Sequence, residues 1–168
     1  LAGNSTVVKL PSADPATFLI FARILQAAGF PDGSLNVITP SGSDLTEFVD
    51  DPRIDAITFT GSTGIGKSIA KKAGMKRIHL ELGGNGAALV SRKADLELAA
   101  EEAVHGALNF SGQRCDAVSR VLVEEDVADR FLELAHSELE AHKMGDPMEE
   151  DTQVGPLIDS KAVKNVQE

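Results

Sequence analysis

Short apolar stretches alternate with segments of helical periodicity through the first half of the chain, and this alternation limits the folds available to it. The strand-like stretches are residues 6–10, 35–39, 54–60 and 77–82, each bounded by glycine, proline or acidic residues. Apolar residues at helical spacing lie between them. Strands that alternate with helices form βαβ units, in which the strands are parallel and helices cover both faces. The sequence therefore predicts an α/β fold with a doubly wound parallel sheet.

The pattern changes after Gly83 and Gly84, where two glycines let the chain leave a strand without steric cost. The elements expected downstream are strands at 87–90 and 119–123, helices at 96–110 and 127–142, and a last helix from Asp159 or Ser160. The first of these helices should bury its apolar side chains, Leu98, Ala99, Ala103, Ala107 and Leu108. We expect one domain over residues 1–82 and another over residues 83–168.

Charge and composition exclude several functional classes. The chain has 168 residues and a formal net charge of −10. Nucleic acids and anionic membranes both require a basic face, so neither is an expected partner. Aromatic residues make up only 4% of the chain, without Trp or Tyr, which disfavours a stacking platform for bases or sugars. Hydrophobic residues, at 42%, suffice for a buried core.

A single cysteine, Cys115, rules out an internal disulfide framework, so a cytoplasmic location is expected. No apolar run reaches the length of a membrane span, and the first residues do not have the pattern of a signal peptide. The four histidines lack metal-ligand spacing, so no metal site is predicted. The chain starts without Met and stops within a helix-like run, which we interpret as a fragment of a longer protein.

Cys115 and Glu81 are the candidate catalytic residues. A thiol is a poor nucleophile until it loses its proton, and a carboxylate can accept that proton or activate a water. Arg114, directly before the thiol, adds positive charge that favours the thiolate. Glycines flank both candidates, Gly83 after Glu81 and Gly112 before Cys115, which predicts turns that display functional groups. Considered alone, the cysteine could equally be a small buried hydrophobe and the glutamate a solvated residue.

A glycine-rich stretch, residues 61–68, follows a predicted strand and opens a helix. Free amide groups at a helix start bind phosphate. The stretch also satisfies the Walker A pattern, which makes a P-loop nucleotide triphosphatase the rival interpretation. Two strands precede this loop, whereas P-loops usually follow the first strand, and the rival gives Glu81 and Cys115 no role. Lys9 and Ser12 follow a strand at the same sheet edge, where they could face an adenosine ribose or its phosphate.

Several motifs together resemble the aldehyde dehydrogenase superfamily over essentially the whole chain. The sequence contains, in that family's order and spacing, Phe59-Thr60-Gly61-Ser62-Thr63, Leu80-Glu81-Leu82-Gly83-Gly84 and Gly112-Gln113-Arg114-Cys115. Motifs in register are more specific than one Walker-like match, which we therefore set aside as fortuitous. The resemblance implies that residues 1–82 are the C-terminal part of a Rossmann-like NAD(P)-binding domain. Residues 83–168 would then be the N-terminal part of a catalytic domain.

The resemblance also implies a cofactor, NAD or NADP. Gly61 and Ser62 would hold its pyrophosphate, and Lys9 and Ser12 would lie near the adenosine ribose. Ser12 stands where the family commonly has a glutamate that grips the ribose hydroxyls. Without that carboxylate a 2′-phosphate meets less repulsion, so the sequence favours NADP over NAD.

The same resemblance implies a catalytic mechanism. Cys115 would attack the aldehyde carbonyl, and Glu81 would activate the water that hydrolyses the resulting thioester. A non-catalytic relative that keeps only the fold is a further alternative, although the presence of both residues argues against it. The full-length protein is expected to be a homodimer or homotetramer.

Arg114 is the residue from which the class of substrate can be inferred. Gly-Gln-Arg-Cys resembles the branch that includes non-phosphorylating glyceraldehyde-3-phosphate dehydrogenases and phosphonoacetaldehyde dehydrogenases. An arginine beside the nucleophile can hold a substrate phosphate through two parallel hydrogen bonds. We therefore expect a small phosphorylated aldehyde, with glyceraldehyde 3-phosphate first. A general, lactaldehyde or succinate-semialdehyde dehydrogenase remains the alternative, with Arg114 acting only on the thiol.

Overall fold

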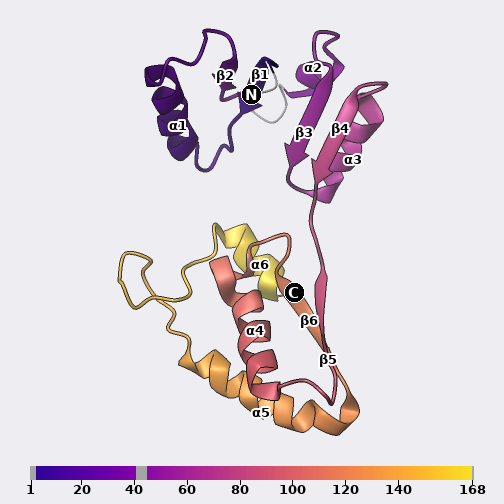
Figure 1. Ribbon diagram of the computed structural model, residues 1–168, viewed down its shortest axis with the longest axis vertical. Coiled ribbons are helices and arrows are strands. Elements are labelled where there is room, and N and C mark those ends of the chain that lie inside the picture. The colour runs from indigo at the N-terminus through magenta and orange to yellow at the C-terminus, as the bar shows by residue number, and fades with distance from the viewer. Residues whose placement is uncertain (1–2, 41–44, 168) are drawn as a thin grey trace. The chain divides into compact units, whose positions relative to one another are not determined.

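The computed structural model describes residues 3–40 and 45–167 of the chain (Figure 1). Parallel strands alternate with helices, so the predicted α/β class is confirmed. The chain divides into two compact units. Unit 1 comprises Leu1–Thr60 and Gly64–Leu80, and unit 2 comprises Gly61–Thr63 and Glu81–Glu168. The predicted domains, residues 1–82 and 83–168, are functional assignments and stay predictions.

The first segment of unit 1 is a strand–helix–strand unit. The strands β1 (Thr6–Lys9) and β2 (Leu35–Ile38) pair in parallel, as predicted from the alternation. Between them α1 (Ala16–Ala27) begins after Pro15, a residue suited to the start of a helix. The helix ends before Gly29, whose φ of 80° is a left-handed conformation that glycine adopts without strain.

The remainder of unit 1 contains a second pair of strands. Its elements are α2 (Leu45–Asp50), β3 (Ala56–Thr60), α3 (Thr63–Lys72) and β4 (Arg77–Glu81). β3 and β4 belong to one sheet. The amide of Arg77 donates to the carbonyl of Asp55 at 3.1 Å, and the amide of Gly61 donates to that of Glu81 at 3.0 Å. The two strands therefore run in the same direction and reach their carboxyl ends together.

Unit 2 is built on a third parallel pair. Its elements are β5 (Gly86–Val90), α4 (Leu96–Leu108), β6 (Val118–Val123), α5 (Glu125–Ala141) and α6 (Ser160–Gln167). α4 and α5 pack against each other and against the two strands (Figure 1). The core lies between these layers and centres on Val90, Ala100, Ala103 and Phe131.

Two expectations for the helix over 96–110 are wrong. Leu98 is 53% exposed, because the buried stripe runs through Ala100, Ala103 and Val104, and Leu98 lies two residues, or about 200°, away from Ala100 around the helix. The helix also stops at Leu108 rather than at Phe110. Phe110 has a φ of 54°, which a right-handed helix cannot contain, so the chain turns there instead.

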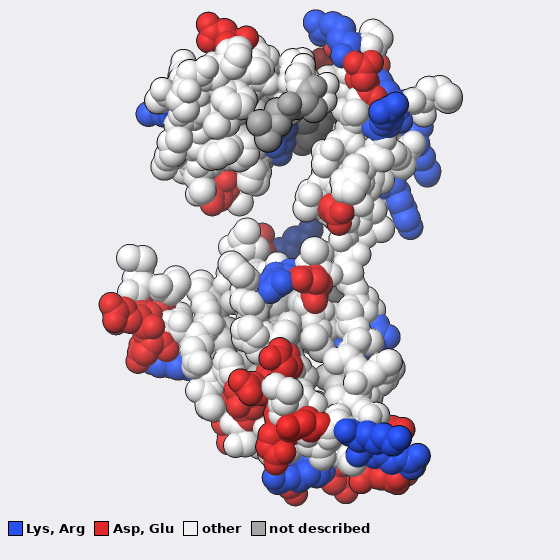
Figure 2. Space-filling model, in the orientation of Figure 1, with Lys and Arg blue, Asp and Glu red and all other residues white. Residues whose placement is uncertain are grey.

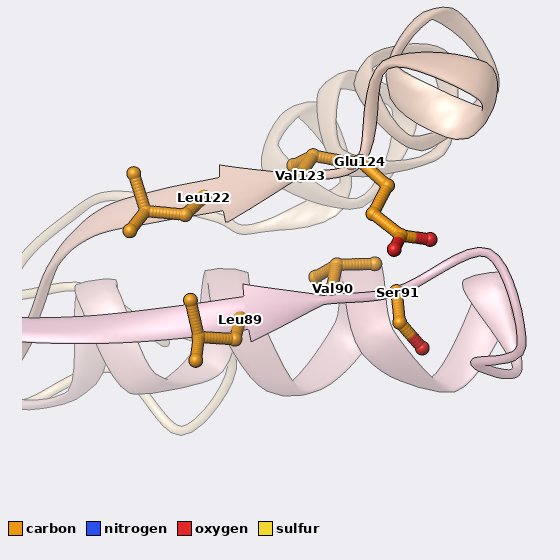
Figure 3. A pocket seen from close by; sticks show the side chains of 6 residues that line it. All are labelled: Leu89, Val90, Ser91, Leu122, Val123 and Glu124. Carbon is orange, nitrogen blue, oxygen red and sulfur yellow. The ribbon is translucent and has the colours of Figure 1, made fainter.

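Within the described part of the chain, helices pack against only one face of the β5–β6 sheet. Side chains alternate between the two faces of a strand, so Val90 points into the core while Leu89 points away from it. Leu89 and Leu122 are opposite each other in the register and are 79% and 55% exposed. They line a shallow apolar hollow that reaches Ser91 and Glu124 at the ends of the strands (Figure 3).

Charged side chains are unevenly distributed over the surface. Acidic side chains gather over α4 and α5 on the face of unit 2 shown in Figure 2. Within residues 3–40 and 45–167, none of the helices combines the length and apolar character needed to cross a bilayer. The same described residues contain no group of three or more His, Cys, Asp and Glu side chains arranged to hold a metal ion.

Candidate active site

Cys115 lies on the loop between α4 and β6, which we call the thiol loop (residues 109–117). The loop begins with a 3-10 turn (Asn109–Gly112), and Cys115 follows as an exposed, free cysteine. The amide of Ala117 donates to the carbonyl of Arg114 at 3.3 Å, which closes a turn around the thiol residue. The prediction of a displayed thiol at a turn is therefore confirmed, and the alternative of a buried hydrophobe is not what the structure has.

The backbone of Gly84 packs directly against the thiol loop. A Cβ atom at Gly84 would overlap the carbonyl oxygen of Cys115, so only glycine fits at this position. Gly86 is close to the same loop, since a Cβ there would lie 3.0 Å from the carbonyl oxygen of Ala117. Gly84 precedes the β5–β6 pairing by two residues, and Gly86 begins it opposite Val118. The glycines after Glu81 thus allow that segment to lie beside the loop that carries the thiol.

The Gly84→Ala variant tests this contact. The added methyl group must displace the Cys115 carbonyl, and such overpacking typically destabilises a protein by about 1–3 kcal/mol. We expect a lower thermal midpoint of the full-length protein and at least about a tenfold loss of activity, because displacing a catalytic group disturbs its geometry.

Gly83→Ala is the matched control for that variant. A Cβ at Gly83 would make an ordinary contact of 3.5 Å with Oγ1 of Thr63, so the thermal midpoint should hardly change. Equal stability of the Gly84 and Gly83 variants would show that the close approach to Cys115 is not a constraint.

Glu81 is the last residue of β4 and is exposed. Its carbonyl accepts the Gly61 amide, and Gly83 lies beside the side chain of Thr63, so the glycine-rich loop and the Glu81 segment are joined. Only Leu82 and Gly83 lie between Glu81 and Gly84, so the backbone spans at most about 11 Å over these three steps. The contact between Gly84 and Cys115 therefore brings Glu81 into the same region of unit 2 as the thiol.

The glycine-rich loop continues into α3, as the phosphate-binding interpretation requires. Gly61 and Ser62 are exposed, and α3 starts at Thr63 with no acidic residue in its first turn. The amide groups and dipole of a helix start favour an anion, and the first turn of α3 itself carries no acidic residue that would repel one. Lys71 and Lys72 lie in the last turn, where cations interact favourably with the helix dipole.

Lys9 and Ser12, the two residues expected at the adenosine ribose, both lie in unit 1. Lys9 ends β1 and is half-buried, and the next residue, Leu10, is 1% exposed with its amide donating to Ile38 at 3.1 Å. Ser12 is exposed after Pro11. The buried leucine fixes the backbone from which both side chains project. Their role toward a ribose stays a prediction.

Arg114 is paired with Asp116, a partner that the sequence analysis did not foresee. The guanidinium donates to the carboxylate through Nε at 2.9 Å and Nη2 at 2.5 Å, and it lies 6.0 Å from the centre of the Phe110 ring. Hydrogen bonding from Arg114 lowers the pKa of the Asp116 carboxyl, so this carboxylate keeps its charge to a lower pH than an isolated aspartate. The sequence feature that could have predicted this ion pair is a carboxylate two residues after an arginine.

Gln113 and Ser111 are further residues whose contacts the sequence did not indicate. Both bind backbone groups of the segment over residues 155–158, on the opposite end of unit 2 in sequence. The motifs gave neither residue a role of its own, because both contacts are with backbone groups that are distant in sequence.

Comparison with known proteins places the chain in a family. Residues 1–168 match the model described as the aldehyde dehydrogenase family. The chain belongs to the aldehyde dehydrogenase family, and the resemblance found in its motifs is confirmed. The Walker-like stretch falls inside this match.

Three curated relatives illustrate the range of the family. The chain is 39% identical to the 1-pyrroline-5-carboxylate dehydrogenase of Geobacillus sp. (strain WCH70), covering 100% of this chain and 34% of that protein. It is 43% identical to the hydroxyisobutyraldehyde dehydrogenase of Mycolicibacterium austroafricanum (99% and 34%). It is 40% identical to the NADP-dependent glyceraldehyde-3-phosphate dehydrogenase of Streptococcus equinus (99% and 35%). The chain thus spans about a third of these relatives.

Solved structures agree on the fold. The glyceraldehyde-3-phosphate dehydrogenase GapN of Methanocaldococcus jannaschii, complexed with NADP, has a TM-score of 0.93 and 35% identity, over 98% of this chain and 37% of that one. The betaine aldehyde dehydrogenase of Staphylococcus aureus, in complex with NAD+, has a TM-score of 0.89 and 32% identity, over 94% and 32%. Both cofactors therefore occur among similar structures.

Proposed function

We propose that the full-length protein oxidises an aldehyde to a carboxylic acid with NAD(P)+ as the hydride acceptor. One observation carries this proposal: the Gly84 backbone packs against the Cys115 carbonyl, which joins the segment of Glu81 to the loop of the only cysteine. An exposed thiol and an exposed carboxylate on joined segments suit covalent catalysis followed by hydrolysis.

Cys115 is the nucleophile in this proposal. Its thiolate sulfur attacks the carbonyl carbon of the aldehyde, a carbon–sulfur bond forms, and the carbonyl oxygen becomes an oxyanion. The backbone amide of Cys115 would help stabilise that oxyanion. A bound nicotinamide ring supplies the acceptor for the hydride on this carbon, whose loss restores the carbonyl and leaves a thioester on the sulfur.

Glu81 is the general base for the second half of the reaction. Its carboxylate takes a proton from a water molecule as the water oxygen attacks the thioester carbon. The carbon–sulfur bond then breaks, the carboxylic acid leaves, and the Cys115 thiolate is restored. The position of Glu81 at the exposed end of β4 supports this role, because water can reach the carboxylate there.

The chain offers residues that fit a dinucleotide. The exposed Gly61 and Ser62 at the start of α3 would bind the pyrophosphate, because the first helical turn is free of carboxylates. Lys9 and Ser12 would contact the adenosine ribose, and the serine would tolerate a 2′-phosphate. We therefore propose NADP as the preferred cofactor. A higher kcat/KM with NAD than with NADP in the full-length enzyme would contradict that preference.

For the substrate we propose a small anionic aldehyde, with glyceraldehyde 3-phosphate first. Arg114 directly precedes the thiol, and the acidic side chains over α4 and α5 would otherwise repel an anion (Figure 2). Asp116 holds one edge of the guanidinium, so a substrate anion would bind through its remaining N–H groups. The name of the Streptococcus equinus relative, which contains glyceraldehyde 3-phosphate, supports this choice. The name of the Mycolicibacterium austroafricanum relative, which contains hydroxyisobutyraldehyde, argues for an uncharged substrate instead.

An aldehyde panel on the full-length enzyme tests both proposals. It should contain glyceraldehyde 3-phosphate, phosphonoacetaldehyde, succinate semialdehyde, lactaldehyde and an uncharged alkanal, each assayed by formation of reduced nicotinamide. Absence of turnover with every aldehyde would refute aldehyde oxidation. A preference for lactaldehyde or the alkanal would refute the anionic substrate alone.

Arg114→Ala should lower kcat/KM for the preferred anionic aldehyde far more than for the alkanal. A charge-assisted hydrogen bond contributes about 1.5–3 kcal/mol, which corresponds to a loss of roughly ten- to a hundredfold. Asp116→Asn is the companion variant, since it removes the competing carboxylate and should leave or raise that efficiency. Equal losses on charged and neutral aldehydes would show that Arg114 acts on the thiol rather than on the substrate.

A further inference from the structure

We propose that Gln113 is a positioning residue that, together with Ser111, fastens the thiol loop to the segment over residues 155–158. The inference rests on the proposed role of Cys115 as the nucleophile. It assigns a purpose to two side chains near the thiol that do not themselves react.

The thiol loop needs an external support because its backbone is strained. Phe110 and Ser111 have φ values of 54° and 57°, in the left-handed region that residues other than glycine rarely adopt. Gly112 follows with a φ of 70°, and a Cβ there would lie 2.9 Å from the carbonyl oxygen of Ala107. Two consecutive residues other than glycine in this region, Phe110 and Ser111, persist only where surrounding contacts hold them.

Gln113 supplies such contacts at both ends of its amide. Its Oε1 accepts the backbone amide of Ile158 at 2.8 Å, and its Nε2 donates to the carbonyl of Phe110 at 3.3 Å. The Gln113 side chain therefore links Phe110 to Ile158, which lies 45 positions after Gln113 in the sequence. Both contacts require an amide, because a glutamate lacks the N–H donor and an alanine lacks both groups.

Ser111 makes the second attachment to the same segment. Its hydroxyl donates to the carbonyl of Gly155 at 2.8 Å, so the loop both gives and receives a hydrogen bond across this contact. The segment is itself well fixed at Val154, which is 7% exposed and pairs with Met144 in an isolated bridge. The loop is thus tied to a supported part of unit 2 and not to a loose end.

The two attachments and the Gly84 contact hold different parts of the thiol loop. Gln113 and Ser111 hold the residues before the thiol, and Gly84 fixes the backbone carbonyl of Cys115 itself. The side chain stays exposed while its backbone is held. A nucleophile works best when it is kept in its attacking geometry, and a misplacement of about 1 Å can reduce the rate by about a hundredfold.

Gln113→Ala in the full-length enzyme tests the inference, with Asn36→Ala as the control. Asn36 is also a side-chain amide that binds backbone groups, since its Nδ2 donates to the carbonyls of Gly33 at 2.9 Å and Thr6 at 3.4 Å, but it belongs to unit 1 and contacts neither the thiol loop nor residues 155–158 through these bonds. Gln113→Glu keeps the acceptor for Ile158 and should restore part of the lost function. Two measurements are needed: amide hydrogen exchange of residues 109–117 and 155–158, and the rate constant of the first hydride-transfer burst.

We expect Gln113→Ala to speed exchange in both segments by about tenfold or more and to slow the burst by roughly ten- to a hundredfold. Asn36→Ala should change neither, although both variants remove hydrogen bonds and can lower the thermal midpoint. Unchanged exchange in Gln113→Ala would overturn the attachment, and faster exchange with an unchanged burst would overturn the positioning role. If the wild-type enzyme oxidises no aldehyde, the proposed function fails, and exchange alone still decides whether Gln113 holds the loop.

Discussion

Replacing Cys115 with alanine in the full-length protein should abolish aldehyde oxidation, lowering the rate by at least about 10⁴-fold. No other cysteine in these 168 residues can supply a thiol, and the alanine side chain cannot form a bond to the carbonyl carbon. The change should leave folding intact because the Cys115 side chain is exposed and takes part in no disulfide. The measurement is formation of reduced nicotinamide under saturating cofactor.

Cys115→Ser is the control for size and polarity. A serine hydroxyl has nearly the same shape as the thiol but is a far weaker nucleophile without a dedicated base, so this variant should also be inactive. Both variants should bind the cofactor as the wild type does, since the residues proposed to hold its pyrophosphate are Gly61 and Ser62. Activity within about tenfold of the wild type in either variant would mean that another group is the nucleophile.

Replacing Glu81 with glutamine should separate the two halves of the reaction. The first hydride transfer needs only the Cys115 thiolate, so a burst of about one reduced cofactor per active site should remain. Hydrolysis of the thioester should then stall, and steady turnover should fall by about 10²–10⁴-fold, the usual contribution of a general base. Rapid-quench kinetics on the full-length enzyme measures both phases.

Glu102→Gln provides a comparison for this variant. Glu102 is an exposed carboxylate on α4 of the same unit, so its replacement makes the same change of charge at a position with no proposed role. Its burst and steady turnover should equal those of the wild type. Steady turnover at the wild-type level in Glu81→Gln would rule out the role assigned to Glu81.

The order of strands and helices could be predicted from the sequence because local patterns decide it. β2 and β6 follow from short apolar stretches bounded by turn residues, and α1 from apolar residues at helical spacing between Pro15 and Gly29. The end of α4 could not be predicted in this way. Phe110 continues the apolar pattern of the helix, but the long-range contacts of Ser111 and Gln113 hold the chain in a left-handed turn.

The candidate site was predictable in its reactive groups and not in its contacts. The motif around Glu81 and the lone cysteine point to the chemistry, since few residue types can act as nucleophile or base. The pairing of Arg114 with Asp116, and the approach of Gly84 to Cys115, depend on how the backbone folds back on itself. A glycine has no side chain whose chemistry would indicate such a contact, so only the three-dimensional structure shows which glycine is required.

The most direct test of the account is the mass of the stalled intermediate. Full-length Glu81→Gln should be mixed with the preferred aldehyde and oxidised cofactor, quenched in acid and digested for mass spectrometry. The account predicts that the peptide containing Cys115 gains the mass of the acyl group, that the modification is removed by hydroxylamine, and that Cys115→Ala with the same Glu81 change gains nothing. Reduced cofactor formed without an acyl group on Cys115, or an acyl group on another residue, would contradict it.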